Sequence, residues 1–241
     1  MKIYHQELKY LLFIDIETVS CASSYQDLPN PMQNFWEKRA KIYQEQDEVP
    51  AEAFEKYAAL HAEFCQIVSI GLGFFYLNEQ SELGLRVKSI SNDDEKKLLQ
   101  EFKDLLEKRL SKRKRLVAHN GKEFDYPFLC RRMLIHGLGL PAIFQHLRNK
   151  PWDNPHLDTM EMWKFGDRKN YSSLRLLAHL FGLPPYHDAI DGSMVSSIYY
   201  KDKNLERIAS YCRNDVITTA QLYLCLQNLP IVKQKNIIEV S

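Results

Sequence analysis

YLLFIDIE, residues 10–17, is a short and mostly apolar run that ends in two acids. Such a run is typical of a strand buried in the centre of a sheet. Residues two apart on a strand point to the same face, so Asp15 and Glu17 would lie side by side. Buried charges must be paired or bind a metal ion, because burying an isolated charge is costly. The alternative is a strand that ends at Ile14, which would leave both acids in water.

The sequence around this run alternates between strand-like and helix-like segments. Further strands are predicted at 66–77, 83–91 and 115–121, with a weak one near His156–Leu157. Helices are predicted at 33–46, 51–64, from an N-cap at Asn92 to about Lys112, from an N-cap at Ser172, and at 204–227. This order predicts an α/β domain in which helices cover a mixed sheet. Residues 20–64 interrupt it as a helical insertion after the first strand.

Composition and charge fit an ordinary folded protein. The 241 residues are 45% hydrophobic, which is enough for a substantial core, and no apolar run approaches a membrane span. The N-terminus lacks the pattern of a secretory signal, so we expect an intracellular, cytoplasmic protein without a membrane partner. Five cysteines without a CxxC pair argue against a disulfide framework or a structural zinc site. Cys212 and Cys225 are expected to be small core residues.

The net charge is only +1, but the charges are distributed unevenly. Residues 108–115 read KRLSKRKR, with six basic residues in eight. One interpretation is a solvated helix end whose cations complement the helix dipole. The other is a patch that contacts phosphates.

A second group of polar residues, HNGKEFD (119–125), follows a predicted strand and opens a helix. Asp125 would lie in the first helical turn, where an acid also favours the helix dipole. Asn120 and Gly121 are ordinary turn residues. The segment by itself therefore leaves open whether Asp125 serves chemistry or only the helix. Asp158 in HLDTM is an expected N-cap, and His187, Asp188 and Asp191 are expected to form a polar turn before the next helix.

A third group, YCRND (211–215), lies within the long predicted helix 204–227. Tyr211 and Asp215 are four residues apart, so they share one helix face, which also carries Ile208. An acid on the inward side of an apolar helix needs a partner. The alternative is a half-exposed Asp next to a core Tyr.

Taken together and in this order, the three groups resemble the three exonuclease motifs of the DEDD superfamily. Tyr four residues before the last Asp is the DEDDy form, since the DEDDh form would need His where Ser210 stands. The chain resembles most the exonuclease domain of family B DNA polymerases, in a stand-alone version. FCQIVSIGLGFF (64–75) and the stretch 188–224 around Asp191 add to the resemblance. It implies an RNase H-like fold and one exonuclease domain over residues 1–241, with 20–64 as the helical insertion.

The resemblance also implies a function. It makes the chain a metal-dependent 3′→5′ exonuclease that acts on DNA single strands or frayed 3′ ends and releases nucleoside 5′-monophosphates. Two Mg²⁺ (or Mn²⁺) ions would be held by Asp15, Glu17, Asp125 and Asp215. Tyr211 would orient the attacking water, because a phenol with a pKa near 10 is a poor base. Thr18, Asn120 and Phe124 would bind the terminal nucleotide, although Phe124 fits a core position equally well.

Two other functions stay open from the sequence. The first is an exonuclease that trims RNA 3′ ends, since no residue can be assigned to reading a 2′-hydroxyl. The second is a nucleic-acid-binding module that has lost catalysis. The intact set of acids argues against the second, because clustered carboxylates repel one another and are costly to keep without a cation.

Overall fold

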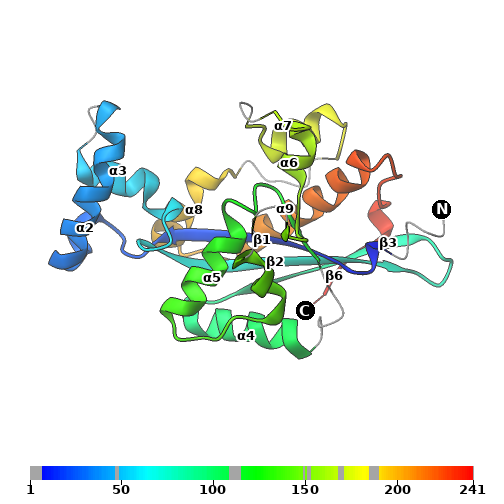
Figure 1. The fold of residues 1–241 in the computed structure, drawn as a ribbon, viewed down its shortest axis with the longest axis horizontal. Coiled ribbons are helices and arrows are strands. Elements are labelled where there is room, and N and C mark those ends of the chain that lie inside the picture. The colour runs from blue at the N-terminus through cyan, green and yellow to red at the C-terminus, as the bar shows by residue number, and fades with distance from the viewer. Residues whose placement is uncertain are drawn as a thin grey trace.

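The computed structural model describes residues 7–46, 49–108, 115–148, 150, 153–167, 171–184 and 190–240. Its centre is a six-stranded sheet in the order β5-β4-β1-β2-β3-β6. Helices cover both faces of this sheet, and a separate group of helices extends from one end of it (Figure 1). The α/β architecture with a mixed sheet is therefore confirmed. The basic residues 109–114 lie outside the described residues.

Strand β1 (Leu11–Ser20) is the centre of the sheet. It pairs antiparallel with β2 (Cys65–Leu77) and parallel with β4 (Arg115–Ala118). Its side chains alternate between the two faces. One face packs with α4 (Glu95–Lys108) and α5 (Asp125–Ile135), and the other packs with α9 (Leu205–Leu226). The strand is buried on both faces, as its apolar sequence predicts.

The remaining strands lie towards the two edges. Strand β3 (Leu83–Ser91) has the bounds predicted from its alternating pattern, and the weak strand β5 (Leu157–Asp158) pairs with β4. Strand β6 (Ile237–Glu239) was not predicted and runs parallel to β3. Three residues are too few to show a periodic pattern, so the sequence of this segment does not predict a strand. It is a strand because it pairs with β3.

The helical insertion is confirmed, but its helices are shorter than predicted. It contains η1 (Tyr25–Asp27), α2 (Asn30–Ala40), η2 (Lys41–Gln46), α3 (Pro50–Tyr57) and η3 (Ala58–Leu60). Residues 61–64 were expected to be helical and instead form the turn into β2. The insertion has a small core of its own, in which Trp36 packs edge-on against Phe54 and Phe64.

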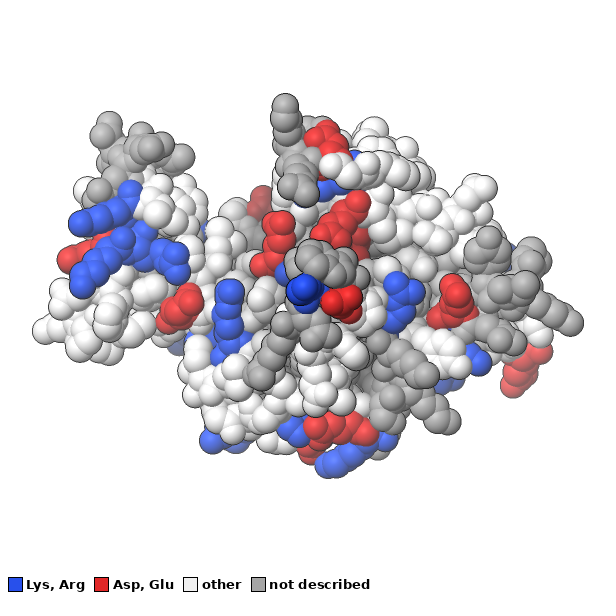
Figure 2. All heavy atoms as spheres, viewed as in Figure 1, with Lys and Arg blue, Asp and Glu red and all other residues white. Residues whose placement is uncertain are grey.

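Basic side chains gather over this insertion on the face shown in Figure 2. The exposed cations of α2 and the start of η2 are Lys38, Arg39 and Lys41. The Thr18 hydroxyl of β1 donates to the Ala59 carbonyl of the insertion at 2.7 Å. At the base of the insertion, the Cys21 amide donates to the Phe64 carbonyl at 2.8 Å and so joins its two ends.

Several shorter helices complete the described fold. They are η4 (Ala142–Arg148), α6 (Thr159–Lys164), α7 (Leu174–Leu180), η6 (Gly192–Met194), α8 (Val195–Ser197), the π-helical η7 (Ile198–Asp202) and η8 (Gln234–Asn236). No helix among the described residues has both the length and the apolar character that crossing a bilayer requires.

Two predicted N-caps are displaced along the chain. Helix α4 is capped by Asp94, whose Oδ1 accepts the Lys97 amide at 3.2 Å. The Oδ1 of Asn92 accepts the amide of Asp94 instead, before the helix begins. Helix α7 is capped by Ser173 and not by Ser172. In both cases two suitable residues are close in sequence, and local propensity does not choose between them. The caps at Asp158 and Asp191 are confirmed, whereas His187 and Asp188 lie outside the described residues.

Candidate active site

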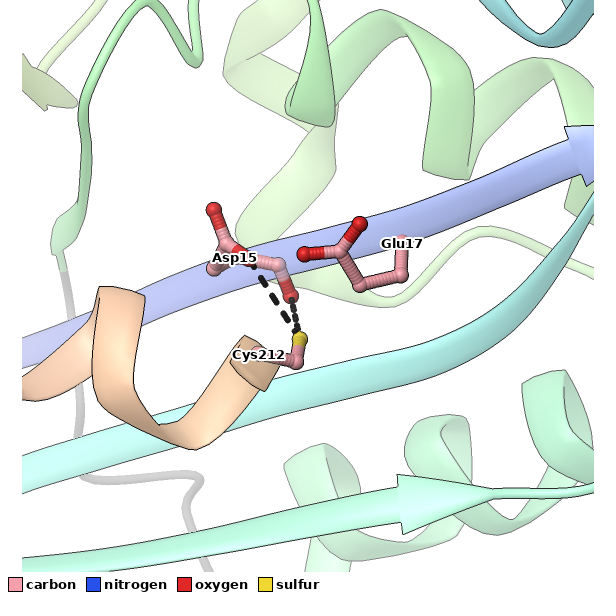
Figure 3. A group of neighbouring side chains, drawn as sticks. All are labelled: Asp15, Glu17 and Cys212. Carbon is pink, nitrogen blue, oxygen red and sulfur yellow. Dashed lines mark hydrogen bonds between the residues drawn. The ribbon is translucent and has the colours of Figure 1, made fainter. Parts of the chain in front are cut away.

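Asp15 and Glu17 lie on the face of β1 that is covered by α9 (Figure 3). The alternative in which the strand ends at Ile14 is wrong, because β1 continues to Ser20. Asp15 is half-buried and Glu17 is 7% exposed. The pairing with β2 shifts register between Glu17 and Thr18. Such a bulge bends the strand and redirects side chains next to it, here at the end of the acidic pair.

Asp125 reaches β1 from the other side of the strand. It is the first residue of α5 and is 3% exposed, and its Oδ1 accepts the backbone amide of Ile16 at 3.1 Å. Strand β4 pairs with β1 only as far as Phe13, so its ladder leaves the Ile16 amide available to a side chain. A carboxylate 109 positions away in sequence therefore takes the place of a strand partner, directly between Asp15 and Glu17.

Asp215 and Tyr211 approach from α9, one helical turn apart. Both are half-buried, and the Tyr211 hydroxyl is hydrogen-bonded to the Asp215 side chain. Asp215 is close enough to Asp15 and Glu17 for its charge to raise the pKa of each of them. The four predicted acids and the tyrosine therefore gather around one point of the central strand.

Burial makes all four carboxyl groups hard to ionise, and the charges of neighbouring acids add to this for Asp15, Glu17 and Asp125. Burial raises the pKa of Asp15 and Glu17 well above the usual range, and the negative charges of their neighbours add to it. Burial also raises the pKa of Asp125 and of Asp215 to about 7, although a hydrogen bond from Tyr211 acts in the opposite direction on Asp215. Among the ion pairs of the described residues, none includes Asp15, Glu17 or Asp125.

Such a donor set fits divalent cations. Carboxylate oxygens are the ligands that Mg²⁺ and Mn²⁺ prefer, and a cation would remove the repulsion that keeps these groups protonated. Asp15, Glu17 and Cys212 offer one ligand atom each within 4.8 Å of one another. The oxygens of the two acids fit a hard cation better than the sulfur does, because thiolates select softer metals.

Cys212 is buried, as predicted for a small core residue, but it also contacts the acids (Figure 3). Its thiol is 3.4 Å from both the backbone oxygen and Oδ2 of Asp15. Burial raises the pKa of this thiol well above its ordinary value, so the sulfur is a neutral donor to the carboxylate. Its spacing of three from Asp215 places both residues on one helix face, which is the sequence signal for this contact.

The three residues expected to bind the terminal nucleotide differ in what they already contact. The Thr18 hydroxyl is hydrogen-bonded to the insertion. Phe124 is half-buried and its ring centroid is 4.4 Å from that of Phe128, so it fits the core position considered from the sequence. Asn120 has a left-handed backbone with a φ of 63°, and its buried Oδ1 has no hydrogen-bond partner. Of the three, Asn120 therefore has the side chain with a free hydrogen-bonding atom.

Two further residues beside this group are held by several hydrogen bonds each. His119 is hydrogen-bonded through both ring nitrogens, to the Thr159 hydroxyl at 2.9 Å and to the Ser172 carbonyl at 2.8 Å. Asp158 caps α6 as predicted, but it also holds the loop before Asp125. Only the capping role had a signal in the sequence, namely an acid directly before a helix.

Comparison with known proteins agrees with this arrangement. Residues 57–234 match the family described as "Predicted 3'-5' exonuclease related to the exonuclease domain of PolB". The matched part contains Asp125, Tyr211 and Asp215, whereas Asp15, Glu17 and most of the insertion precede it. No curated protein matches the chain.

Among solved structures, the chain is similar to the family B DNA polymerase from the hyperthermophilic archaeon Pyrobaculum calidifontis, with a TM-score of 0.53 and 15% sequence identity. The match covers 90% of this chain but only 24% of the polymerase chain. At this identity the likeness concerns the fold, and it supports the RNase H-like arrangement expected from the sequence.

Proposed function

We propose that this chain, which belongs to the family of predicted 3′-5′ exonucleases related to the exonuclease domain of PolB, hydrolyses the terminal phosphodiester bond at the 3′ end of DNA with two divalent metal ions. The observation that carries the proposal is the group of four carboxylates around β1, two buried and two half-buried, whose pKa values are all raised. A folded chain gains nothing in stability from such a group, so a cation is the reason to keep it.

Asp15, Glu17, Asp125 and Asp215 are the residues that would hold the ions, Mg²⁺ or Mn²⁺. When bound, such ions supply positive charge at the attacking and leaving oxygens of the phosphodiester. The carboxylates differ in the hydrogen bonds that hold them in place. Asp125 is fixed by the Ile16 amide, while Asp15 is held by the Cys212 thiol. These contacts leave further oxygen lone pairs on each group for ligation.

We assign to Tyr211 the role of orienting the attacking water. Burial, followed by the charges of the three nearest acids, raises the pKa of its hydroxyl far above the ordinary value, so it stays protonated. A neutral hydroxyl can donate a hydrogen bond and accept one, and it can therefore orient a water molecule without removing its proton.

The terminal nucleotide would lie against Thr18, Asn120 and Phe124. The unpartnered Oδ1 of Asn120 is an acceptor, so it suits a hydroxyl of the sugar better than a phosphate oxygen, which has no proton to donate. Thr18 would contribute through its backbone and methyl group, because its hydroxyl already bonds Ala59. The half-buried Phe124 ring would press against the base through any part of its surface that the core leaves exposed. These contacts do not depend on base identity, so little sequence preference is expected.

We also propose that the chain forms one exonuclease domain with the helical insertion as part of it. One six-stranded sheet runs through the described residues, and the insertion is hydrogen-bonded to β1 through Thr18 and Ala59. The polymerase that it is similar to is about four times as long, so a role beside a polymerase does not follow from the likeness.

The test uses a 5′-labelled DNA oligonucleotide with its 3′ end free or blocked, alone and annealed to a complement. A ladder that shortens from the free 3′ end, needs Mg²⁺ or Mn²⁺ and stops with a chelator is expected. Duplex ends should be degraded more slowly, because fraying costs about 1–2 kcal/mol of stacking per step. A matched RNA oligonucleotide shows which nucleic acid is preferred. Internal cuts in a circular single strand, or full activity in chelator, would contradict the proposal.

A further inference from the structure

Asp158 is a buried carboxylate that accepts four backbone amides. It ends β5, directly beside the end of β4, and is 2% exposed. Its Oδ1 accepts the amides of Asn120 and Met160 at 2.9 Å each, and that of Glu161 at 3.4 Å. Its Oδ2 accepts the amide of Lys122 at 3.1 Å. Only a group with two acceptor oxygens can serve donors on both sides in this way.

Two of these bonds are local and two are not. Those from Met160 and Glu161 form the N-cap of α6, a role that Ser, Thr or Asn also fills. Those from Asn120 and Lys122 join positions 38 and 36 residues away in sequence. They hold the turn that connects β4 to α5, which a helix cap does not require.

This turn leads directly to Asp125. Asn120 is held in the left-handed conformation, and its carbonyl accepts the amides of Glu123 and Phe124 at 3.3 and 3.0 Å. A Cβ atom at Gly121 would lie 2.4 Å from the Ala118 Cβ, so the turn is packed tightly against β4. The Tyr126 hydroxyl then bonds the Leu157 carbonyl at 2.8 Å, which fixes the first turn of α5 to the same strand as Asp158. The backbone on both sides of Asp125 is therefore anchored to β5.

The negative charge of Asp158 makes the neighbouring carboxyl group of Asp125 harder to ionise. It lies close enough to Asp125 to raise the pKa of that carboxyl group further, in addition to the effect of burial. A neutral residue would cap α6 without this repulsion. The charge is explained by the second pair of amides, since a carboxylate binds backbone N–H donors about twice as strongly as a neutral acceptor.

We propose that Asp158 is a positioning residue of the candidate active site, which sets the conformation of residues 120–122 and thereby the place of the Asp125 carboxylate and of the Asn120 amide. The inference rests on the proposed function for its meaning in catalysis, but the geometric part can be tested by metal binding alone. Asp158 itself neither ligates the metal nor touches the substrate.

The experiment compares Asp158→Asn with Asp94→Asn. Asn keeps one oxygen for the α6 cap and for Asn120, but it places an NH₂ group against the Lys122 amide, so it removes one of the two bonds to the turn while it preserves the cap. Asp94 is the exposed cap of a different helix, α4, and is the matched control. Mn²⁺ binding is titrated by electron paramagnetic resonance, and kcat and KM are measured on a single-stranded oligonucleotide.

For Asp158→Asn we expect Mn²⁺ affinity and kcat to fall by about 10- to 100-fold, the usual size for an outer partner of a metal ligand. A partial recovery of the rate at saturating Mn²⁺ should accompany it. Asp94→Asn should change neither quantity, although both variants lose some thermal stability. A general structural defect would not separate the two variants in this way.

Wild-type Mn²⁺ affinity and kcat in Asp158→Asn would overturn the proposal. If that variant does not fold, hydrogen exchange of the wild-type protein decides, because the Asn120 and Lys122 amides should be strongly protected and rapid exchange of both would contradict the inference. If the wild-type protein hydrolyses no nucleic acid, the proposed function fails, while the Mn²⁺ titration still tests the role of Asp158.

Discussion

The molecule contains two groups of buried carboxylates, and they behave in opposite ways. Glu95, at the start of α4, is 6% exposed and is surrounded by donors. The acids on β1, α5 and α9 are buried or half-buried and have one another as neighbours. Burial alone would raise the pKa of Glu95, yet hydrogen bonds from Arg132 and the Ile67 amide hold it below the ordinary value. The pKa values of the second group are all raised.

Glu95 is bound as a structural carboxylate. Arg132 donates to both of its oxygens, His136 lies 2.7 Å from Oε2, and the Ile67 amide donates to Oε1 at 2.7 Å. Arg132 also donates to the Ala62 carbonyl at 2.9 Å. This group therefore connects α4, α5 and the beginning of β2, and its charge is compensated within the chain. Burial by itself therefore does not mark a functional acid, and what distinguishes the second group is that its pKa values stay raised.

The largest expected effect comes from breaking the group of acids on β1, α5 and α9. Single substitutions Asp15→Asn, Glu17→Gln, Asp125→Asn and Asp215→Asn should each lower kcat by about a thousandfold or more, since metal stabilisation of the transition state is worth several kcal/mol. Thermal unfolding without metal should show unchanged or increased stability, because each change removes repulsion. Near-normal turnover in any one of these variants would exclude that residue from the metal site.

The compensated group should respond in the reverse manner. Glu95→Gln leaves Arg132 buried with an incomplete partner, so the free energy of unfolding should fall by about 3–5 kcal/mol. The rate per folded molecule should stay close to that of the wild type, because Glu95 contacts none of the four acids. Urea unfolding and an assay below the unfolding transition measure the two quantities. A Glu95→Gln variant that is stable but inactive would contradict this expectation, because Glu95 would then influence the four acids.

The pH dependence of stability sharpens the comparison. In the unfolded chain Asp125 and Asp215 should titrate near pH 4, whereas in the folded protein their pKa is about 7. Between these values the folded state binds more protons, so the free energy of unfolding without metal should fall as the pH rises. Stabilisation by Mg²⁺ should grow over the same interval, because the ion binds the ionised carboxylates.

Melting temperatures measured with chelator and with Mg²⁺ across this pH range test that expectation. Asp215→Asn removes one titrating group and should flatten the decline, whereas Asp94→Asn should leave it unchanged. A melting temperature that rises with pH in chelator would contradict the raised pKa values.

The smallest effect is expected at the tyrosine. Tyr211→Phe keeps the ring on α9 and loses only the hydroxyl, so kcat should fall by about tenfold, roughly the value of one hydrogen bond. KM should change little. A loss as large as that of Asp215→Asn would mean that the hydroxyl does more than orient water.

The sequence predicted most of the architecture because its signals are local. The alternation in 83–91, the apolar run at 10–17 and the long helix 204–227 each depend on the periodicity of one element. The same periodicity placed Asp15 with Glu17 and Tyr211 with Asp215. It did not find β6, whose three residues carry too little pattern, and it placed the ends of the insertion helices too late, where the chain turns into β2.

By itself, then, the sequence determined the class of fold, which follows from strand and helix spacing, and the candidate acids, which its resemblance to the exonuclease motifs implies. Only the tertiary structure decided how these acids meet. The bond from the Ile16 amide to Asp125, the thiol contact of Cys212 with Asp15 and the hold of Asp158 on the turn at Asn120 join residues 36 to 197 positions apart. Each depends on which polar groups the packed strands and helices leave without a regular partner, and no local pattern carries that information.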